Sequence, residues 1–379
     1  MGKGCFSIVL DTSLQNSRGH YLQFSIDVCE SYERTQSRSV IFTSNQALRD
    51  WFQARRLEFV ELKFINTEQE SDIFSELNSF LNITADNSSK PRHLFILRGK
   101  DLSDNKLSKL EKMLSEHHDL HIDVLVNISG IISRSKEAVY ENLVLEKFTK
   151  LSSRVNFLAW DKRITAVSDL KNFRFLPEPK NITPRLSIPT KTVIGFYGKL
   201  SFDRGLFDIL VSVFFNPKLQ YRISGYGFNR KYLYRSRNFI SMRRTPVRGI
   251  FSLALNYLVQ LSFLSNRVAF EQKYFKDEAE MTSEMQMCSA IFFSCTRSPY
   301  SSGLVYQSFA AGIPVVWTPG NSAMAHVLDE SFPLGRITLR DFSRRNRLFD
   351  LVKQVKDVRT APIFDYEFFD DVLSRCSFN

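Results

Sequence analysis

Short apolar runs alternate with helical stretches along this chain, and the alternation stops at one proline-rich segment and then starts again. Ser7 to Leu10 and Val40 to Thr43 are apolar runs of strand length, and Gly19 to Tyr32 has the periodicity of a helix between them. This order is typical of a parallel sheet covered by helices. Further strands are predicted at His93 to Leu97 and Ile122 to Val126, and further helices at Asn45 to Arg55 and Lys106 to His117.

The break lies between residues 176 and 189, where four prolines interrupt both helix and strand. The pattern restarts at Thr192 to Tyr197, and 379 residues suit two domains. We therefore predict two doubly wound α/β domains facing a central cleft, at 1–180 and 181–360, with a helical tail at 361–379 that packs back on the first domain. Further strands of the second domain are predicted at Gln220 to Ser224, Ala290 to Ser294 and Pro314 to Trp317.

The net charge is +11, from 51 basic and 40 acidic residues, which favours an anionic partner. There is no zinc-finger spacing and no glycine–aromatic RNA-binding signature, so we expect no nucleic acid. The five cysteines form no CxxC pair, which argues against a disulfide framework or a zinc site. The apolar run Cys5 to Leu10 is too short for a signal peptide, and no run reaches the ~20 residues of a membrane span. These features predict a cytoplasmic protein.

The first segment with a chemical pattern runs from Val193 to Leu206. A buried strand enters a turn at Gly198, the cation Lys199 follows, and Arg204 and Gly205 precede a helix. Glycine permits a close backbone approach, and a helix N-terminus beside two cations favours a diphosphate. An ordinary strand–turn–helix with surface cations remains the alternative.

The second segment places Ser301, Ser302 and Gly303 before a helix that carries Gln307 and ends at Gly312. Small residues before a helix expose backbone N–H groups and hydroxyls that bind anions. An ordinary βαβ crossover with a serine cap remains the alternative.

Taken together and in this order, the two segments make residues 190–330 resemble the retaining GT-B glycosyltransferases called glycosyl transferases group 1. Lys199 stands where that family usually has arginine, and Arg204 where it usually has lysine. Gly225-Tyr226-Gly227 is similar to the family's Gly-x-Gly after a strand, and residues 312–316 match its Gly-x-Pro-Val-Val.

The resemblance implies a GT-B fold and transfer of a sugar from a nucleoside-diphosphate sugar, with no other cofactor and no metal. It implies that Lys199 and Arg204 hold the donor diphosphate and that the loop at Gly19 and His20 faces the sugar or acceptor. A helix-capping role remains the alternative for His20. The residues assigned to catalysis are Lys199, Arg204 and His20; those assigned to donor binding are Gly19, Gly198, Gly225, Tyr226, Ser301, Ser302, Gly303, Leu304 and Gln307.

The chain departs from the family pattern at the two glutamates that flank the donor loop. Gln307 replaces the second, which normally holds the ribose, and the first would fall near Pro299 or Tyr300. An amide still binds a hydroxyl, but without the strength of a charged acceptor. This leaves a second hypothesis, a catalytically inactive GT-B-like binding or scaffold protein.

Residues 230–264 are longer than the fold requires and begin with a cluster of arginines and one lysine. The following stretch, 249–264, is apolar apart from a polar stripe at Ser252, Asn256 and Gln260. At this length it suits burial in a bilayer interface, and the cations add attraction to anionic lipid. We expect peripheral contact with the inner face of the plasma membrane and a glycan or lipid-linked acceptor; a core helix beside a solvated basic loop remains the alternative.

Overall fold

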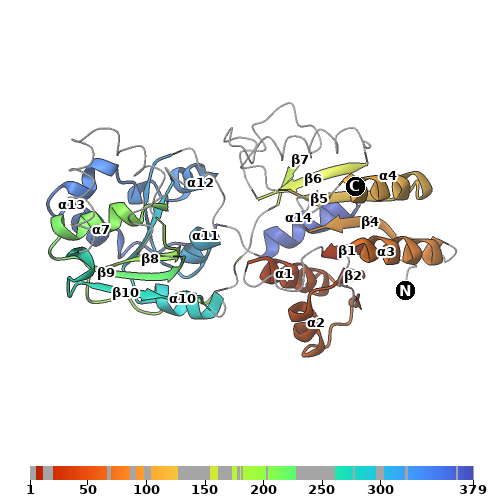
Figure 1. Cartoon of the computed structure of the whole chain (residues 1–379), viewed down its shortest axis with the longest axis horizontal. Coiled ribbons are helices and arrows are strands. Elements are labelled where there is room, and N and C mark those ends of the chain that lie inside the picture. Colours follow the sequence, from red (N-terminus) through yellow and green to blue (C-terminus); the bar gives the residue numbers. More distant parts are fainter. Residues whose placement is uncertain are drawn as a thin grey trace, which may run out of the picture. The chain divides into compact units, whose positions relative to one another are not determined.

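The structure is a computed structural model that divides into two compact units. Unit 1 comprises Met1–Pro179 and Phe364–Asn379, and unit 2 comprises Lys180–Ile363. Each contains one parallel β-sheet with helices on its faces (Figure 1). The residues described are 6–11, 20–65, 70–85, 91–97, 104–126, 154–160, 173–176, 180, 182–201, 204–227, 261–275, 278–295, 303–320, 323–363 and 366–378.

The sheet of unit 1 has seven parallel strands in the order β3-β2-β1-β4-β5-β6-β7. The order reverses direction at β1, as in other doubly wound folds. The strands are β1 (Phe6–Asp11), β2 (Ser39–Thr43), β3 (Val60–Phe64), β4 (Pro91–Ile96), β5 (His121–Leu125), β6 (Val155–Ala159) and β7 (Phe173–Phe175). The helices are α1 (His20–Arg34), α2 (Gln46–Gln53), α3 (Glu70–Ala85), α4 (Asp104–Glu116) and α14 (Tyr366–Phe378).

Both faces of this sheet are buried because each strand sends alternate side chains into a different core. Ile8 and Leu10 of β1 pack in a cluster with side chains of α3 and α4. Val9, between them, packs in a second cluster with side chains of α1, α2 and α14. Burial on both faces explains why the central strands appear in the sequence as continuous apolar runs.

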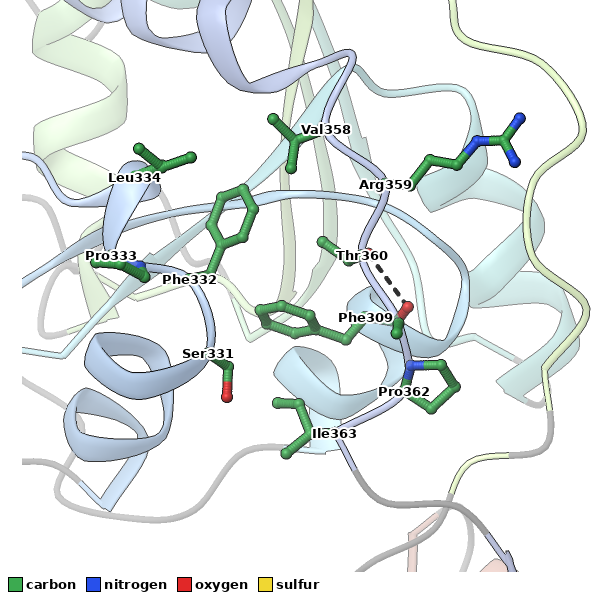
Figure 2. A pocket seen from close by; sticks show the side chains of 11 residues that line it. Phe309, Ser331, Phe332, Pro333, Leu334, Val358, Arg359, Thr360, Pro362 and Ile363 are labelled. Carbon is green, nitrogen blue, oxygen red and sulfur yellow. Dashed lines mark hydrogen bonds between the residues drawn. The ribbon is translucent and has the colours of Figure 1, made fainter.

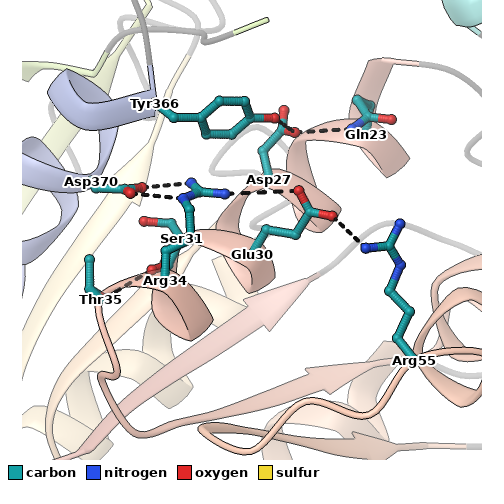
Figure 3. Close-up of polar contacts among 9 residues, drawn as sticks. All are labelled: Gln23, Asp27, Glu30, Ser31, Arg34, Thr35, Arg55, Tyr366 and Asp370. Carbon is teal, nitrogen blue, oxygen red and sulfur yellow. Dashed lines mark hydrogen bonds and ion pairs between the residues drawn. The ribbon is translucent and has the colours of Figure 1, made fainter. Parts of the chain in front are cut away.

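The last helix, α14, packs on α1 and thereby belongs to unit 1 although it follows unit 2 in the sequence. Phe369 of α14 is fully buried in the core that it shares with α1. Polar contacts add to this packing (Figure 3): Arg34 donates two hydrogen bonds to Asp370, at 2.9 and 2.7 Å, and lies 4.1 Å over the ring of Tyr366. Tyr366 in turn donates to Asp27 at 2.7 Å.

We expect the pair of Arg34 and Asp370 to contribute a coupling energy of about 1 kcal/mol, at the upper end for exposed pairs because the contact is bidentate. The measurement is a double-mutant cycle with Arg34→Ala and Asp370→Ala. Denaturant unfolding of the wild type and of each variant gives the free energies of unfolding from which the coupling is calculated. The exposed pair Lys63–Glu61, at 2.6 Å, serves as control and should give less than about 0.5 kcal/mol. Equal coupling in the two cycles would show that Arg34 holds α14 no better than a surface pair.

The sheet of unit 2 has five parallel strands in the order β10-β9-β8-β11-β12. Tyr197 and Ile291 pack on one face with side chains around α10 and α11, while Phe292 packs edge-on against Phe342 on the other. The strands are β8 (Val193–Lys199), β9 (Gln220–Tyr226), β10 (Val268–Gln272), β11 (Ala290–Ser294) and β12 (Val315–Thr318). The helices are α7 (Leu206–Phe215), α10 (Glu278–Gln286), α11 (Gly303–Ala310), α12 (Ala323–Ser331), the 3-10 turns η5 (Pro333–Gly335) and η6 (Leu339–Ser343), and α13 (Arg347–Val355).

The two parallel sheets confirm the predicted α/β class with two doubly wound domains. Residues 230–260 of the predicted membrane-contacting segment lie outside the described residues. Residues 261–264, the described part of this segment, form a helical turn. No helix in the described part of the chain is both long enough and apolar enough to cross a membrane.

Candidate functional site

The carboxyl ends of β8 and β9 bring the first predicted segment together with Tyr226. The two strands run in parallel register, with Gly198 beside Gly225 and Lys199 beside Tyr226. The N–H of Leu200 donates to the carbonyl of Tyr226 at 2.8 Å, so the pairing continues past the end of β8. The sheet thus presents Lys199 and Tyr226 side by side at its carboxyl edge, where ligands of doubly wound folds bind.

At Gly225 the backbone of β8 comes very close to β9. A Cβ atom at this position would lie 1.8 Å from the carbonyl oxygen of Gly198, so no other residue fits without moving the backbone. Gly198 has φ of +92°, a conformation that glycine adopts easily, and a Cβ there would meet nothing within 4 Å. Gly225 therefore serves the packing of the two strands, and Gly198 the turn of the chain.

Lys199 and Arg204 flank the turn that leads into α7. Lys199 is exposed and Arg204 half-buried, and neither side chain forms an ion pair within the described ranges. Gly205, with φ of +92°, begins α7 close to the end of β11: a Cβ there would lie 2.7 Å from Cβ of Ser294. The N-terminus of α7 and the two cations therefore lie at the same edge of the sheet, and the positive end of a helix dipole beside cations favours an anion.

The second predicted segment is described from Gly303 onward, where α11 begins. Ser301 and Ser302 lie outside the described residues. Leu304 is half-buried and packs against the core around Tyr197 and Ile291.

Gln307 lies within α11 and is buried, with its amide nitrogen directed at α10. It donates to the backbone oxygen of Glu278 at 3.0 Å and to the hydroxyl of Thr282 at 2.7 Å. The carboxylate of Glu278 accepts a hydrogen bond from Lys180 at 2.6 Å, which ties the start of unit 2 to the same helix. Gln307 therefore joins α10 to α11, and its contact with a ribose stays a prediction.

The structure describes little of the two site residues predicted in the first domain, Gly19 and His20. Gly19 lies outside the described residues, and His20 is the first residue of α1, with its side chain outside what the structure describes. Their roles toward the sugar or acceptor stay predictions.

Tyr274, just beyond β10, was missed in the sequence although it stands beside a predicted residue. Its ring stacks on that of Tyr226, with centroids 4.7 Å apart and planes inclined by 16°. Tyr274 is 77% exposed and Tyr226 37%, so the pair offers an open aromatic surface next to Lys199. Recognition of Val268–Gln272 as a strand would have placed Lys273 and Tyr274 at the same edge.

Ion pairs behind this surface fix the strand ends to α10. Lys273 contacts Glu271, Glu280 and Glu284 at 3.3, 3.2 and 3.2 Å, and Arg222 donates to Glu284 at 2.7 Å. Burial by itself lowers the pKa of Arg222. The hydrogen bond to Glu284 and the negative charge of Glu284 outweigh burial, so the pKa of Arg222 is raised above its usual value. Arg222 and Lys273 therefore act as fixed cations that hold β9 and β10 to α10.

The buried thiols near the two sheets are poor nucleophiles. Burial raises the pKa of Cys288 to about 12, and burial together with nearby carboxylates raises that of Cys29 well above its usual value. Both remain protonated at neutral pH, and the thiolate is the reactive form. We assign both cysteines to the core.

A pocket of about 480 Å³ lies in unit 2 beside the C-terminal end of α11 (Figure 2). Its wall includes the rings of Phe309 and Phe332, and Thr360 donates to the carbonyl of Phe309 at 3.2 Å. Because α11 begins at Gly303, the pocket lies at the opposite end of this helix from the predicted donor loop. The pocket is therefore separate from the carboxyl edge that carries Lys199 and Arg204.

Comparison with protein-family models found no match, and no curated protein sequence matches the chain. Solved structures do match it over nearly its whole length. Anabaena HepE in complex with UDP and glucose has a TM-score of 0.60 at 11% identity, covering 98% of this chain and 99% of that one. Sucrose-phosphate synthase from Thermosynechococcus elongatus has 0.56 at 12%, covering 98% of each chain.

A third similar structure is the lipopolysaccharide outer core galactosyltransferase WaaB in its apo form. Its TM-score is 0.52 at 12% identity, covering 97% of this chain and 94% of that one. At such identities the likeness concerns the fold. Together with the two parallel sheets, these matches show that the chain has the GT-B fold, the fold of glycosyltransferases such as HepE, sucrose-phosphate synthase and WaaB.

Proposed function

We propose that this protein is a glycosyltransferase that moves a sugar from a nucleoside-diphosphate sugar to a hydroxyl group of a glycan or lipid-linked acceptor. The observation that carries the proposal is the meeting of Lys199, Arg204 and the N-terminus of α7 at the carboxyl edge of the second sheet of a GT-B fold. Solved structures of this fold include one in complex with UDP and glucose and one named as a galactosyltransferase. We propose surface polysaccharide biosynthesis as the setting and retention of the anomeric configuration as the outcome.

The proposed chemistry asks for charge stabilisation more than for a nucleophile. As the bond from the sugar to the diphosphate breaks, negative charge grows on the departing phosphate. Lys199, Arg204 and the positive end of the α7 dipole can stabilise that charge, and positive groups already in place stabilise a transition state without first reorganising. The acceptor hydroxyl attacks the anomeric carbon as the bond to the diphosphate breaks, and its proton passes to the departing phosphate oxygen.

We propose the stacked pair of Tyr226 and Tyr274 as the surface that receives the base of the donor. Tyr274→Ala should weaken binding of a nucleoside diphosphate by about tenfold, since stacking of a base on an aromatic ring contributes about 1–3 kcal/mol. Tyr274→Phe keeps the ring and should bind like wild type. The measurement is titration calorimetry with UDP, GDP, ADP and CDP.

Calorimetry also separates the two hypotheses for the whole chain. The observation that favours a GT-B-like scaffold is Gln307, which replaces an acidic residue and whose amide nitrogen donates its hydrogen bonds to α10. Such a scaffold should bind none of the four diphosphates, whereas the transferase should bind at least one of them. Nucleotide binding that Tyr274→Ala does not weaken would still support the transferase hypothesis, but it would show that the base does not stack on Tyr226 and Tyr274.

We propose peripheral attachment to an anionic membrane, on the cytoplasmic side, as part of this function. The support is the basic and then apolar composition of residues 230–264. Attachment would bring the enzyme to lipid-linked acceptors, since these remain in the bilayer.

A further inference from the structure

The amino-terminal edge of the sheet in unit 2 gathers exposed apolar side chains. Each of them stands on a segment that leads into a strand: α7 ends at Phe214 and Phe215 before β9, Leu264 precedes β10, and Met287 precedes β11. Leu186 follows Arg185, whose guanidinium donates to the carbonyl of Cys288 at 2.9 Å, just before β11. Leu186 is 99% exposed and Leu264 77%, and Met287, Phe214 and Phe215 are each more than a third exposed.

These segments are tied together through Asn216, which caps α7. Its side-chain oxygen accepts the N–H groups of Leu348 and Phe349 at the start of α13, at 3.0 and 3.2 Å. Its backbone oxygen accepts Arg267, which lies three residues beyond Leu264, at 2.8 Å. The apolar side chains of α7 and the residues before β10 are therefore held at one junction with α13.

Exposed cations surround the same junction and the neighbouring strand starts. Lys191 precedes β8, Lys218 precedes β9, and Arg344, Arg345 and Arg347 lie at the start of α13, where the N–H of Asn346 donates to the carbonyl of Phe215 at 2.8 Å. Asp341 is buried and contacts Arg344 and Arg347 at 3.2 and 3.9 Å, so it neutralises only part of this charge. Further along α13, Asp350 and Asp357 are balanced by Lys353 and Lys356.

We propose that this amino-terminal edge, carrying Leu186, Phe214, Phe215, Leu264 and Met287 among five cations, docks on an anionic lipid bilayer. Aromatic and aliphatic side chains enter the headgroup boundary while arginine and lysine contact lipid phosphates. A second copy of the chain would meet the same cations, and like charges oppose that contact. Leu264 is also the last residue of the segment 230–264, so this edge adjoins the segment whose composition favours the bilayer.

The location leaves the donor site open. The anion-binding edge is at the carboxyl ends of the strands, about 20 Å away along a strand the length of β8. A water-soluble nucleotide sugar reaches that edge while the opposite edge rests on lipid. The inference deepens the membrane attachment that belongs to the proposed function but does not depend on the donor site.

Flotation of the full chain with vesicles of phosphatidylcholine, with and without phosphatidylglycerol, tests the charge. Wild type should float only with phosphatidylglycerol, and added salt should release it. The triple variant Lys191→Gln, Lys218→Gln and Arg345→Gln should partition about 100-fold more weakly, since each cation near an anionic surface contributes about a fivefold effect. These three side chains form no ion pair within the described ranges, so their replacement leaves the fold intact.

A matched variant of unit 1, with Arg38→Gln, Arg56→Gln and Lys112→Gln, removes the same charge and should float like wild type. The apolar part is tested by Leu186→Ser with Leu264→Ser, expected to weaken partition about tenfold, against Ile83→Ser, which is 68% exposed in unit 1. Equal flotation of the triple variant and wild type, equal loss in the unit 1 variant, or flotation with neutral vesicles would overturn the proposal. Nucleotide binding, measured on the same samples by calorimetry, should be unchanged in every variant, which separates this outcome from failure of the proposed function.

Discussion

Replacing Lys199 by alanine should lower kcat about 100- to 1000-fold, with a much smaller change in the affinity for the donor. Lys199 is exposed at the carboxyl edge beside Tyr226, free of ion pairs within the described ranges, so its charge is available to a ligand. A donor to the leaving diphosphate acts mainly when charge develops, and loss of one such donor typically costs this much in rate. The measurement is release of nucleoside diphosphate from whichever nucleotide sugar calorimetry identifies.

The matched control is Lys218→Ala, which removes an exposed lysine at the opposite edge of the same sheet and should leave kcat unchanged in solution. Arg204→Ala should resemble Lys199→Ala, and the double variant should lose less than the product of the two, because both act on one phosphate group. Wild-type rates in both single variants would mean that the anion-binding edge takes no part in the reaction, and the glycosyltransferase assignment would lose its main support.

The strands that the sequence predicted are the ones buried on both faces. β1, β2 and β11 consist almost entirely of buried residues, so they appear as continuous apolar runs. Two of the edge strands escaped prediction: β3 has the burial pattern buried, exposed, half-buried, exposed, half-buried, and β10 has no fully buried residue. The edge strand β12, in which all four residues are buried, was predicted, whereas the interior strand β6 was missed. An edge strand contacts one neighbour only, so its sequence need not be apolar.

The candidate site was predictable where a local motif forms it and not where distant segments meet. Gly198 and Lys199 end one strand and Arg204 follows it, so their spacing alone indicated a shared edge. Tyr274 stacks on Tyr226 across two strands, and that contact depends on the register of β9 and β10. The hydrogen bonds of Gln307 to α10 depend likewise on how two helices pack, which its place in the donor-loop motif does not reveal.

Gly225→Ala should disrupt unit 2 more severely than any surface change. The added Cβ would lie 1.8 Å from the carbonyl oxygen of Gly198 and 2.8 Å from its carbonyl carbon, so β8 and β9 must separate at their carboxyl ends. The atoms in the way are backbone atoms, which cannot rotate aside as a side chain can. We expect a cost of about 4 kcal/mol or more, which lowers the melting temperature of unit 2 by about 10 °C or more. Differential scanning calorimetry of the full chain measures this.

Gly198→Ala is the matched control because it changes the facing residue by the same methyl group. A Cβ at Gly198 meets nothing within 4 Å, so the cost there is only that of a φ of +92° in alanine, about 1–2 kcal/mol. If close strand approach is what Gly225 provides, Gly225→Ala must melt several degrees below Gly198→Ala, and it must also weaken nucleotide binding, since Tyr226 and Lys199 move with the separated strands. Equal melting of the two variants would mean that the strand ends yield easily, and an edge that yields easily would not hold a preorganised diphosphate site.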